Sequence, residues 1–324
     1  MKKGLIRSVL AVVAMMTWMG SLSAQTLADA QTAYNSSLSK MTENPAEAIE
    51  LLNACLDLCK SVGEEADDVK ALAELNLTKA YVNLGKKYAT AKDFGKAVET
   101  FGIALQKGKQ YKNDDVVKAS SEALAQIHTQ NGFNLYKEKK MEEAMTEVKK
   151  ALEYSPNYGT GWLIKCYVAK DMGDDEAFTE TLNKGLEACV TTNDNRNRTS
   201  IQKLGRDYFL QQGSKAVTAN KMEEAITALE KSISYDGSNK DAYYYYAVAL
   251  SGVKKFQEAA DASNKGLELE TGEADKKARF YYTLGTALKG LGDNAGACSA
   301  FKNALFGPFE EGAKYEIEHE LKCN

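Results

Sequence analysis

The sequence contains little proline and little histidine, and each scarcity excludes a class of protein. Three prolines occur in 324 residues, whereas alanine, glutamate, lysine and leucine are abundant and alternating apolar and polar runs of Val, Ile and Thr are missing. This composition predicts helix nearly throughout and excludes a fold built on strands. Only His128 and His319 can serve as acids or bases near neutral pH. Glycine-rich phosphate loops and the HExxH and GxSxG motifs are absent too, so the sequence indicates no catalytic site and no cofactor.

The sequence also lacks an excess of positive charge. The formal net charge is −4 at pH 7, and acidic and basic residues are interleaved along the expected helices. Interleaved charges are typical of solvated helix faces. A nucleic-acid partner is excluded, because such proteins concentrate lysine and arginine on one face.

The first 24 residues have the layout of a secretory signal peptide. Three basic residues stand among the first seven, an apolar run extends from Val9 to Met19, and small residues end at Ala24. The run is shorter than the roughly 20 apolar residues of a membrane-spanning helix. We expect cleavage after Ala24, no membrane span afterwards, and a periplasmic or outer-membrane-associated protein of a Gram-negative bacterium. The stretch "SLSAQ" resembles the cleavage region of exported proteins of Bacteroidetes-type bacteria.

Two segments of the chain nearly repeat each other. "KMEEAMTEVKKALEYSP" begins at Lys140 and "KMEEAITALEKSISYDG" at Lys221. The two segments begin 81 residues apart. Two units of about 34 residues, a period typical of helical repeats, account for all but 13 of these. The polar stretch from Asn193 to Gly205 has the same length of 13 residues. We therefore expect an N-terminal repeat segment at 25–192, a polar insertion at 193–205 and a C-terminal repeat segment at 206–324.

The residues within each unit resemble the tetratricopeptide repeat. In the clearest unit Tyr81, Gly85 and Tyr88 fill the places of a first helix, and Ala97 and Phe101 those of a second. The same register recurs at Gly132, Ala144, Val148 and Ala151, at Gly213, Ala225, Leu229 and Ser232, and at Gly285, Ala297, Phe301 and Ala304. Three weaker units lie near residues 48–55, 162–185 and 243–266. The resemblance implies an all-α, right-handed superhelix (an α-solenoid) of about seven helix-turn-helix repeats with a C-terminal capping helix.

The resemblance also places the first helices on a concave inner face. Its candidate ligand-groove residues are Phe133, Tyr136, Leu163, Tyr167, Leu210, Tyr244, Tyr245, Val248 and Tyr282. These side chains are aromatic or aliphatic, which suits an extended apolar segment or an amphipathic helix. The lysine, arginine and asparagine cluster with which some relatives grip a peptide carboxylate is missing.

Cysteine and histidine complete the candidate residues. We expect Cys298 and Cys323 to form a disulfide, since the terminal helix should lie against the last repeat. His128 occupies a large-residue place of its repeat and is expected to be packed and hydrogen-bonded. His319 has Glu316, Glu320 and Cys323 at helical spacing, a set that could hold a metal, but a solvated helix end is the expected role and no metal site is predicted.

Function must then come from a surface. The sequence predicts a non-catalytic scaffold of the periplasm or cell envelope that binds a peptide or helical segment of a partner protein, such as another envelope protein. Two alternatives remain: a self-assembling repeat protein that forms homo-oligomers, and an envelope hydrolase. A hydrolase of the glycosidase kind needs two carboxylates about 5 to 10 Å apart, and the predicted groove contains almost none.

Overall fold

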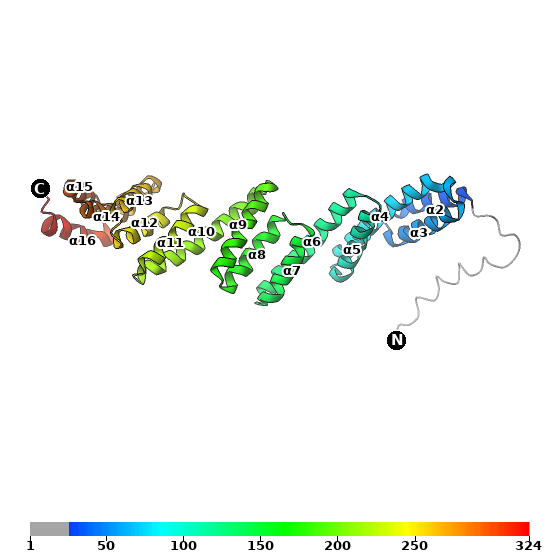
Figure 1. Ribbon diagram of the computed structural model, residues 1–324, viewed down its shortest axis with the longest axis horizontal. Coiled ribbons are helices and arrows are strands. Elements are labelled where there is room, and N and C mark those ends of the chain that lie inside the picture. Colours follow the sequence, from blue (N-terminus) through cyan, green and yellow to red (C-terminus); the bar gives the residue numbers. More distant parts are fainter. Residues whose placement is uncertain (1–25, 324) are drawn as a thin grey trace. The chain divides into compact units, whose positions relative to one another are not determined.

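The computed structural model describes residues 26–323, and the expected signal peptide at 1–24 lies outside them (Figure 1). Within the described range every regular element is helical. The elements are α2 (Leu27–Lys40), α3 (Pro45–Val62), η1 (Glu64–Ala66), α4 (Asp67–Thr90), α5 (Phe94–Gln110), α6 (Asp114–Lys137), α7 (Met141–Tyr154), α8 (Gly159–Met172), α9 (Asp175–Thr191), α10 (Asn195–Thr218), α11 (Met222–Tyr235), α12 (Lys240–Gly252), α13 (Phe256–Leu269), α14 (Ala274–Leu291), α15 (Asn294–Asn303), η2 (Gly307–Phe309), α16 (Glu310–Tyr315) and η3 (Glu316–Glu320). Over the same residues no helix is long and apolar enough to cross a membrane.

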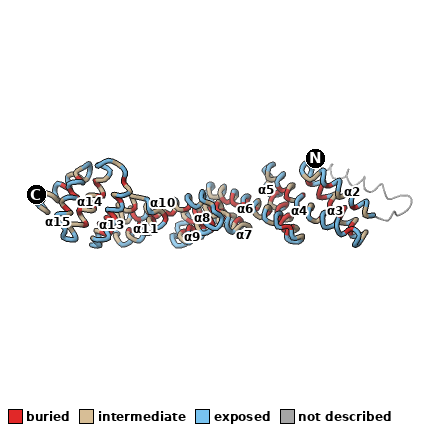
Figure 2. The backbone as a smooth tube through the Cα atoms, turned by 90° about the horizontal axis from the view of Figure 1, so that it is seen from above, coloured by how far each residue is buried: buried red, intermediate tan, exposed pale blue. Residues whose placement is uncertain are grey.

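The helices from α2 to α15 form seven consecutive pairs, and the predicted all-α repeat fold is confirmed. The chain divides into two compact units, unit 1 up to Ile127 and unit 2 from His128 onward. This division falls inside α6, whereas the sequence indicated a boundary near residue 193. Figure 2 shows buried and exposed positions alternating along the helices, as expected when each helix buries one face.

In unit 1 the helix pairs are held by small residues at close crossings and by side-chain hydrogen bonds to backbone. Gly85 on α4 faces the buried Phe101 ring on α5. The Asn83 amide nitrogen donates to the carbonyl of Met41 at 2.9 Å, which ties α4 to the end of α2. Because the two helices of a pair follow each other in sequence, these contacts are set within one or two repeats.

Unit 2 repeats one ionic contact between neighbouring pairs. Arg206 at the start of the groove-lining part of α10 bonds Asp236 at 2.8 Å, and Lys240 at the start of α12 bonds Glu270 at 2.8 Å. Both partners of the second bond lie one full repeat beyond those of the first. An ion pair therefore recurs at equivalent positions of two repeats. Arg206 and Asp236 join α10 to the loop before α12, and Lys240 and Glu270 join α12 to the loop before α14.

The stretch from Asn193 to Gly205 is not an insertion between repeats. It forms the N-terminal part of α10, a helix of 24 residues, and Asp194 caps that helix by accepting a hydrogen bond from the Asn197 backbone at 3.1 Å. Ile201 and Gly205 are buried on one face, and the Asn197 side chain donates to Thr160 at the start of α8. The extra residues lengthen a helix that packs on its neighbours, so the stack continues through them.

Candidate functional site

The nine groove candidates lie on the first helices of successive pairs in unit 2. They are carried by α6, α8, α10, α12 and α14, and every one of them is half-buried. A half-buried side chain packs at its base and presents its end to solvent. Six of the nine gather at three places: an aromatic stack on α6 and α8, a hollow across α10, α12 and α14, and a covered position on α14.

The aromatic stack consists of Phe133, Tyr136 and Tyr167. Ring centroids lie 6.5 Å apart between Phe133 and Tyr136, and 6.1 Å apart between Tyr136 and Tyr167. The Tyr136 hydroxyl donates to Asp171 at 2.8 Å. Burial, and after it this hydrogen bond to a carboxylate, raises the pKa of Tyr136 to about 12. The ammonium of Lys137 lies 4.7 Å from the centre of the Phe133 ring, so a cation already covers part of this surface.

The hollow is a depression of about 480 Å³ across α10, α12 and α14. Its lining residues are Asp207, Leu210, Gln211, Ser214, Asp241, Tyr245 and Arg279. The structure thus brings together two predicted groove residues, Leu210 and Tyr245, with polar neighbours that the sequence analysis did not name. Five of the seven lining residues are polar or charged, so the hollow offers mainly hydrogen-bonding and ionic groups around the side chains of Leu210 and Tyr245.

The charged residues of the hollow form a fixed network. Arg279 bonds Asp241 at 2.6 Å and lies 3.8 Å from Glu270. Glu270 is buried, and its pKa is lowered, first by the hydrogen bond from Lys240. The Arg279 guanidinium also lies 5.2 Å from the centre of the Tyr244 ring. Arg279 is therefore held from three sides and keeps the Asp241 carboxylate at the edge of the hollow.

Two carboxylates belong to this surface although the sequence analysis expected almost none. Asp207 and Asp241 occupy equivalent places in successive repeats, and their side chains are 50% and 46% exposed. Each is bonded through one oxygen to an arginine, Arg206 or Arg279. The sequence could have indicated both aspartates, since each stands one helical turn before a predicted groove residue.

Among residues 26–323 no group of three His, Cys, Asp or Glu side chains could hold a metal ion, and the set around His319 is not brought together.

The two tyrosines that were expected to face the groove together lie with their ring centroids 5.0 Å apart, but only one of them lines the hollow. Tyr245 lines the hollow. Tyr244 packs edge-on against Phe280 with ring centroids 6.0 Å apart, and burial raises its pKa. Tyr243 and Tyr246 pack against the buried cluster of α12 and α13. Only one of the four consecutive tyrosines therefore belongs to the hollow.

The three remaining candidates, Tyr282, Leu163 and Val248, also lie outside the hollow. Tyr282 packs between Phe301 and Phe309, with ring centroids 5.5 and 5.6 Å away, so the C-terminal segment covers it. Leu163 packs beside the cluster that contains Phe178. Val248 is half-buried on α12.

His128 is packed, as expected. It is 8% exposed, bonds Glu147 at 2.8 Å and stacks on Tyr154 with ring centroids 5.7 Å apart. Its contacts are those of a residue that supports the α6–α7 pair, and it lines no part of the hollow.

Successive helix pairs, four of them with a glycine at the close crossing, define a helical-repeat protein. A family model described as "Tetratricopeptide repeat" matches residues 278–305, which comprise most of α14 and all of α15. The last helix pair of this chain is therefore similar to a tetratricopeptide repeat.

Relatives of this chain include a named plant protein and several solved structures. It is 22% identical over 250 residues to the Hsp70-Hsp90 organizing protein of Triticum aestivum, which covers 71% of this chain and 39% of that protein. The chain thus matches about two fifths of that relative's length. The crystal structure of MamA is 21% identical and covers 61% of this chain and 96% of its own, with a TM-score of 0.32. The TPR2AB domain of yeast Sti1, in a complex with pHSP90, is 16% identical and covers 89% and 92%, with a TM-score of 0.31.

Proposed function

We propose that this protein is a non-catalytic scaffold that binds a peptide or helical segment of a partner protein in the hollow across α10, α12 and α14. The observation that carries the proposal is the hollow itself, formed by the first helices of three successive repeats. Stacked repeats characteristically use such surfaces to bind partners. The plant relative is named for two proteins that it organizes, which agrees with a binding role.

The lining suggests what the bound segment contributes. Leu210 and Tyr245 offer apolar surface, and a Tyr at the centre of an interface is a frequent anchor for a partner's apolar side chain. Gln211 and the outward oxygens of the two aspartates offer hydrogen-bond acceptors to backbone amides or side-chain donors. The segment is therefore one that combines an apolar side chain with hydrogen-bond donors.

The location in the periplasm or cell envelope is part of the proposal and depends on residues 1–24. Export would place the scaffold among envelope proteins, which are then the expected partners. The test is to isolate the protein from the native cell envelope and determine its N-terminus by mass spectrometry. A mature chain that begins at Gln25 supports the proposal, and a retained Met1 contradicts it.

The binding site is tested with a partner captured from periplasmic extract and then purified. We expect Tyr245→Ala to weaken its binding about 30-fold, since removal of a buried aromatic anchor costs about 2 kcal/mol. Tyr315→Ala is the matched control, because Tyr315 is 56% exposed and lies outside the hollow. Equal affinity of both variants for the partner would place the binding site elsewhere.

A further inference from the structure

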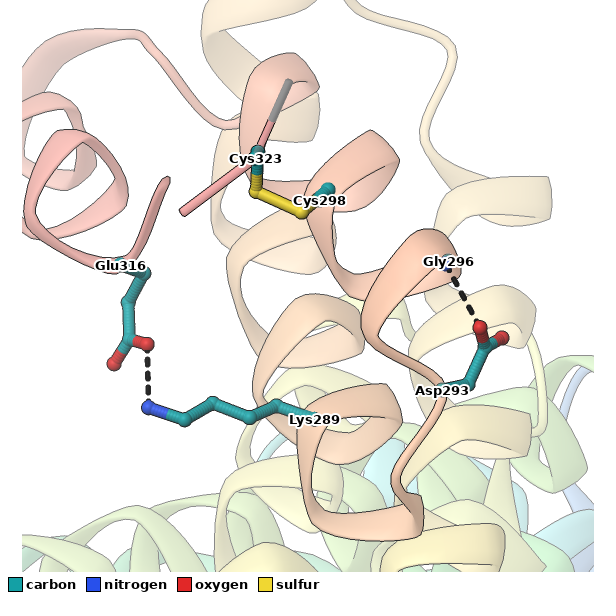
Figure 3. The surroundings of a disulfide bond; sticks show 6 residues. All are labelled: Lys289, Asp293, Gly296, Cys298, Glu316 and Cys323. Atoms are coloured by element: carbon teal, nitrogen blue, oxygen red, sulfur yellow. Dashed lines mark hydrogen bonds and ion pairs between the residues drawn. A yellow bond between two sulfur atoms is a disulfide. The ribbon is translucent and has the colours of Figure 1, made fainter. Parts of the chain in front are cut away.

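The C-terminal strap, residues Gly307–Cys323, closes the last repeat of unit 2. It comprises η2, α16 and η3 and lies against α14 and α15 (Figure 1). A disulfide joins Cys323 at its end to Cys298 on α15, with the two Cα atoms 5.8 Å apart (Figure 3). Both cysteines are half-buried, whereas Cys55, Cys59, Cys166 and Cys189 are buried free thiols.

The strap covers a position whose counterpart on α10 is open to solvent. Tyr282 stands three residues before Gly285 on α14, as Leu210 stands three residues before Gly213 on α10. Leu210 lines the open hollow, but Tyr282 lies beneath Phe309 of the strap. The strap therefore occupies on the last repeat the place that a bound partner would take in the hollow.

Few contacts other than the disulfide hold the strap. Ala313 alone among the strap residues is buried, while Ile317 and Leu321 pack half-exposed against the cluster around Phe301. Lys289 on α14 bonds Glu316 at 2.6 Å and Glu320 at 3.2 Å. Figure 3 shows the Glu316 carboxylate turned toward the Lys289 ammonium.

The local structure of the strap is weak as well. Its helix α16, of six residues, continues directly into η3, of five, and together they are still shorter than the roughly 12 to 15 residues at which a helix becomes marginally stable alone. Segments with few buried contacts open locally at the lowest free energy. A covalent tether at the far end of such a segment is the contact most able to keep it in place.

We propose that the C-terminal strap is a redox latch that, when the Cys298–Cys323 bond is reduced by a dithiol, uncovers the groove surface of α14. A thiolate of the dithiol attacks one sulfur of the bond, and the other cysteine leaves as a thiolate. The second thiol of the reductant then displaces the cysteine in the mixed disulfide. The protein gains two electrons and two protons as two thiols, and the reductant becomes a disulfide.

The four other cysteines are buried, which keeps them from taking part in this exchange. Burial raises the pKa of both Cys55 and Cys166 to about 12, so these side chains remain thiols rather than attacking thiolates. Opening of the latch would extend the proposed binding groove further along α14 and expose Tyr282 and Lys289. The latch does not depend on the identity of any partner, and its test needs none.

The test is hydrogen–deuterium exchange of the full chain with and without dithiothreitol. We expect amides of residues 307–322 to exchange at least about 10-fold faster after reduction, with α10 and α12 unchanged. The Cys298→Ser, Cys323→Ser double variant should show the fast exchange without dithiothreitol and no response to it. Unchanged exchange in the strap after complete reduction, verified by counting thiols, would overturn the proposal.

A second readout follows the Lys289 ammonium. An amine-acylating reagent should label Lys289 several-fold faster after reduction, because the strap then no longer supplies Glu316 and Glu320 to it. The exposed Lys215 on α10 is the control and should label at the same rate in both states. Loss of exchange protection throughout unit 2 would also contradict a latch, since the disulfide would then be a general structural staple.

Discussion

Gly85 provides a sharp test of the packing between α4 and α5. A Cβ atom at this position would lie 2.8 to 3.0 Å from three carbons of the Phe101 ring, which is 2% exposed. Real Cβ atoms do not approach other atoms so closely, and a buried ring has little room to retreat. Gly85→Ala should therefore force the two helices apart.

Gly102 in the same unit is the matched control. It lies inside α5, and a Cβ atom there would meet nothing within 4 Å. Replacing a helical glycine by alanine stabilises by about 1 kcal/mol in the absence of a clash. Overpacking costs about 1 to 3 kcal/mol. Both variants gain the higher helix propensity of alanine, but only Gly85→Ala introduces a steric clash. Their free energies of unfolding should therefore differ by about 1 to 3 kcal/mol, with Gly85→Ala the less stable.

The assay is urea denaturation followed by far-ultraviolet circular dichroism. Gly102→Ala should unfold at a higher urea concentration than the parent, and Gly85→Ala at a clearly lower concentration than Gly102→Ala. A comparison of the two variants removes the helix-propensity effect that they share. If they unfold at the same concentration, the close contact between Gly85 and Phe101 does not exist as described.

Three further predictions concern individual side chains. The pKa of Tyr136 is raised from its ordinary value of 10.0 to about 12 in the folded protein, so the neutral phenol stabilises the fold fully below pH 10, and this stabilisation is lost as the pH rises through 12. The Tyr136→Phe variant should therefore lose less stability than the parent between pH 10 and 12. The ionisation of Tyr136 can be followed by phenolate absorbance. Glu270 has a lowered pKa, so its contribution is present above about pH 4.3 and lost as the pH falls through the folded value. Urea unfolding between neutral and acid pH should show a weaker pH dependence for Glu270→Gln than for the parent. Asp194→Ala removes the cap of α10 and should cost about 1 kcal/mol in the same urea assay, whereas an unchanged midpoint would mean that α10 does not need this cap.

The fold could be predicted from the sequence because its main contacts are short-range. Gly85 meets Phe101 on the very next helix, and Gly285 meets Phe301 at the same separation along the chain. A contact within one repeat leaves its mark as a residue pattern that recurs with the period of the repeat. The residue pattern alone therefore predicts the helix pairs and their close crossings.

The boundary at Asn193–Gly205 could not be predicted in the same way. The buried residues of α10 are Ile201, Gly205, Phe209 and Gly213, one in every four, and most of the others are polar. A helix with so narrow a buried face has nearly the composition of a loop. Which of its residues are buried is decided by the packing of α10 against α8 and α9.

The sequence by itself determined the helices, their pairing and the close contact within each pair, since these depend on residues a few turns apart. Only the tertiary structure placed Asp207, Asp241 and Arg279 around one hollow. It also decided that Tyr244 packs against Phe280 and not in the hollow, and that the strap covers Tyr282. The residues of the hollow come from three helices that are far apart in sequence. Their arrangement depends on how one repeat stacks on the next and on side-chain orientation, and neither leaves a periodic signal in the chain.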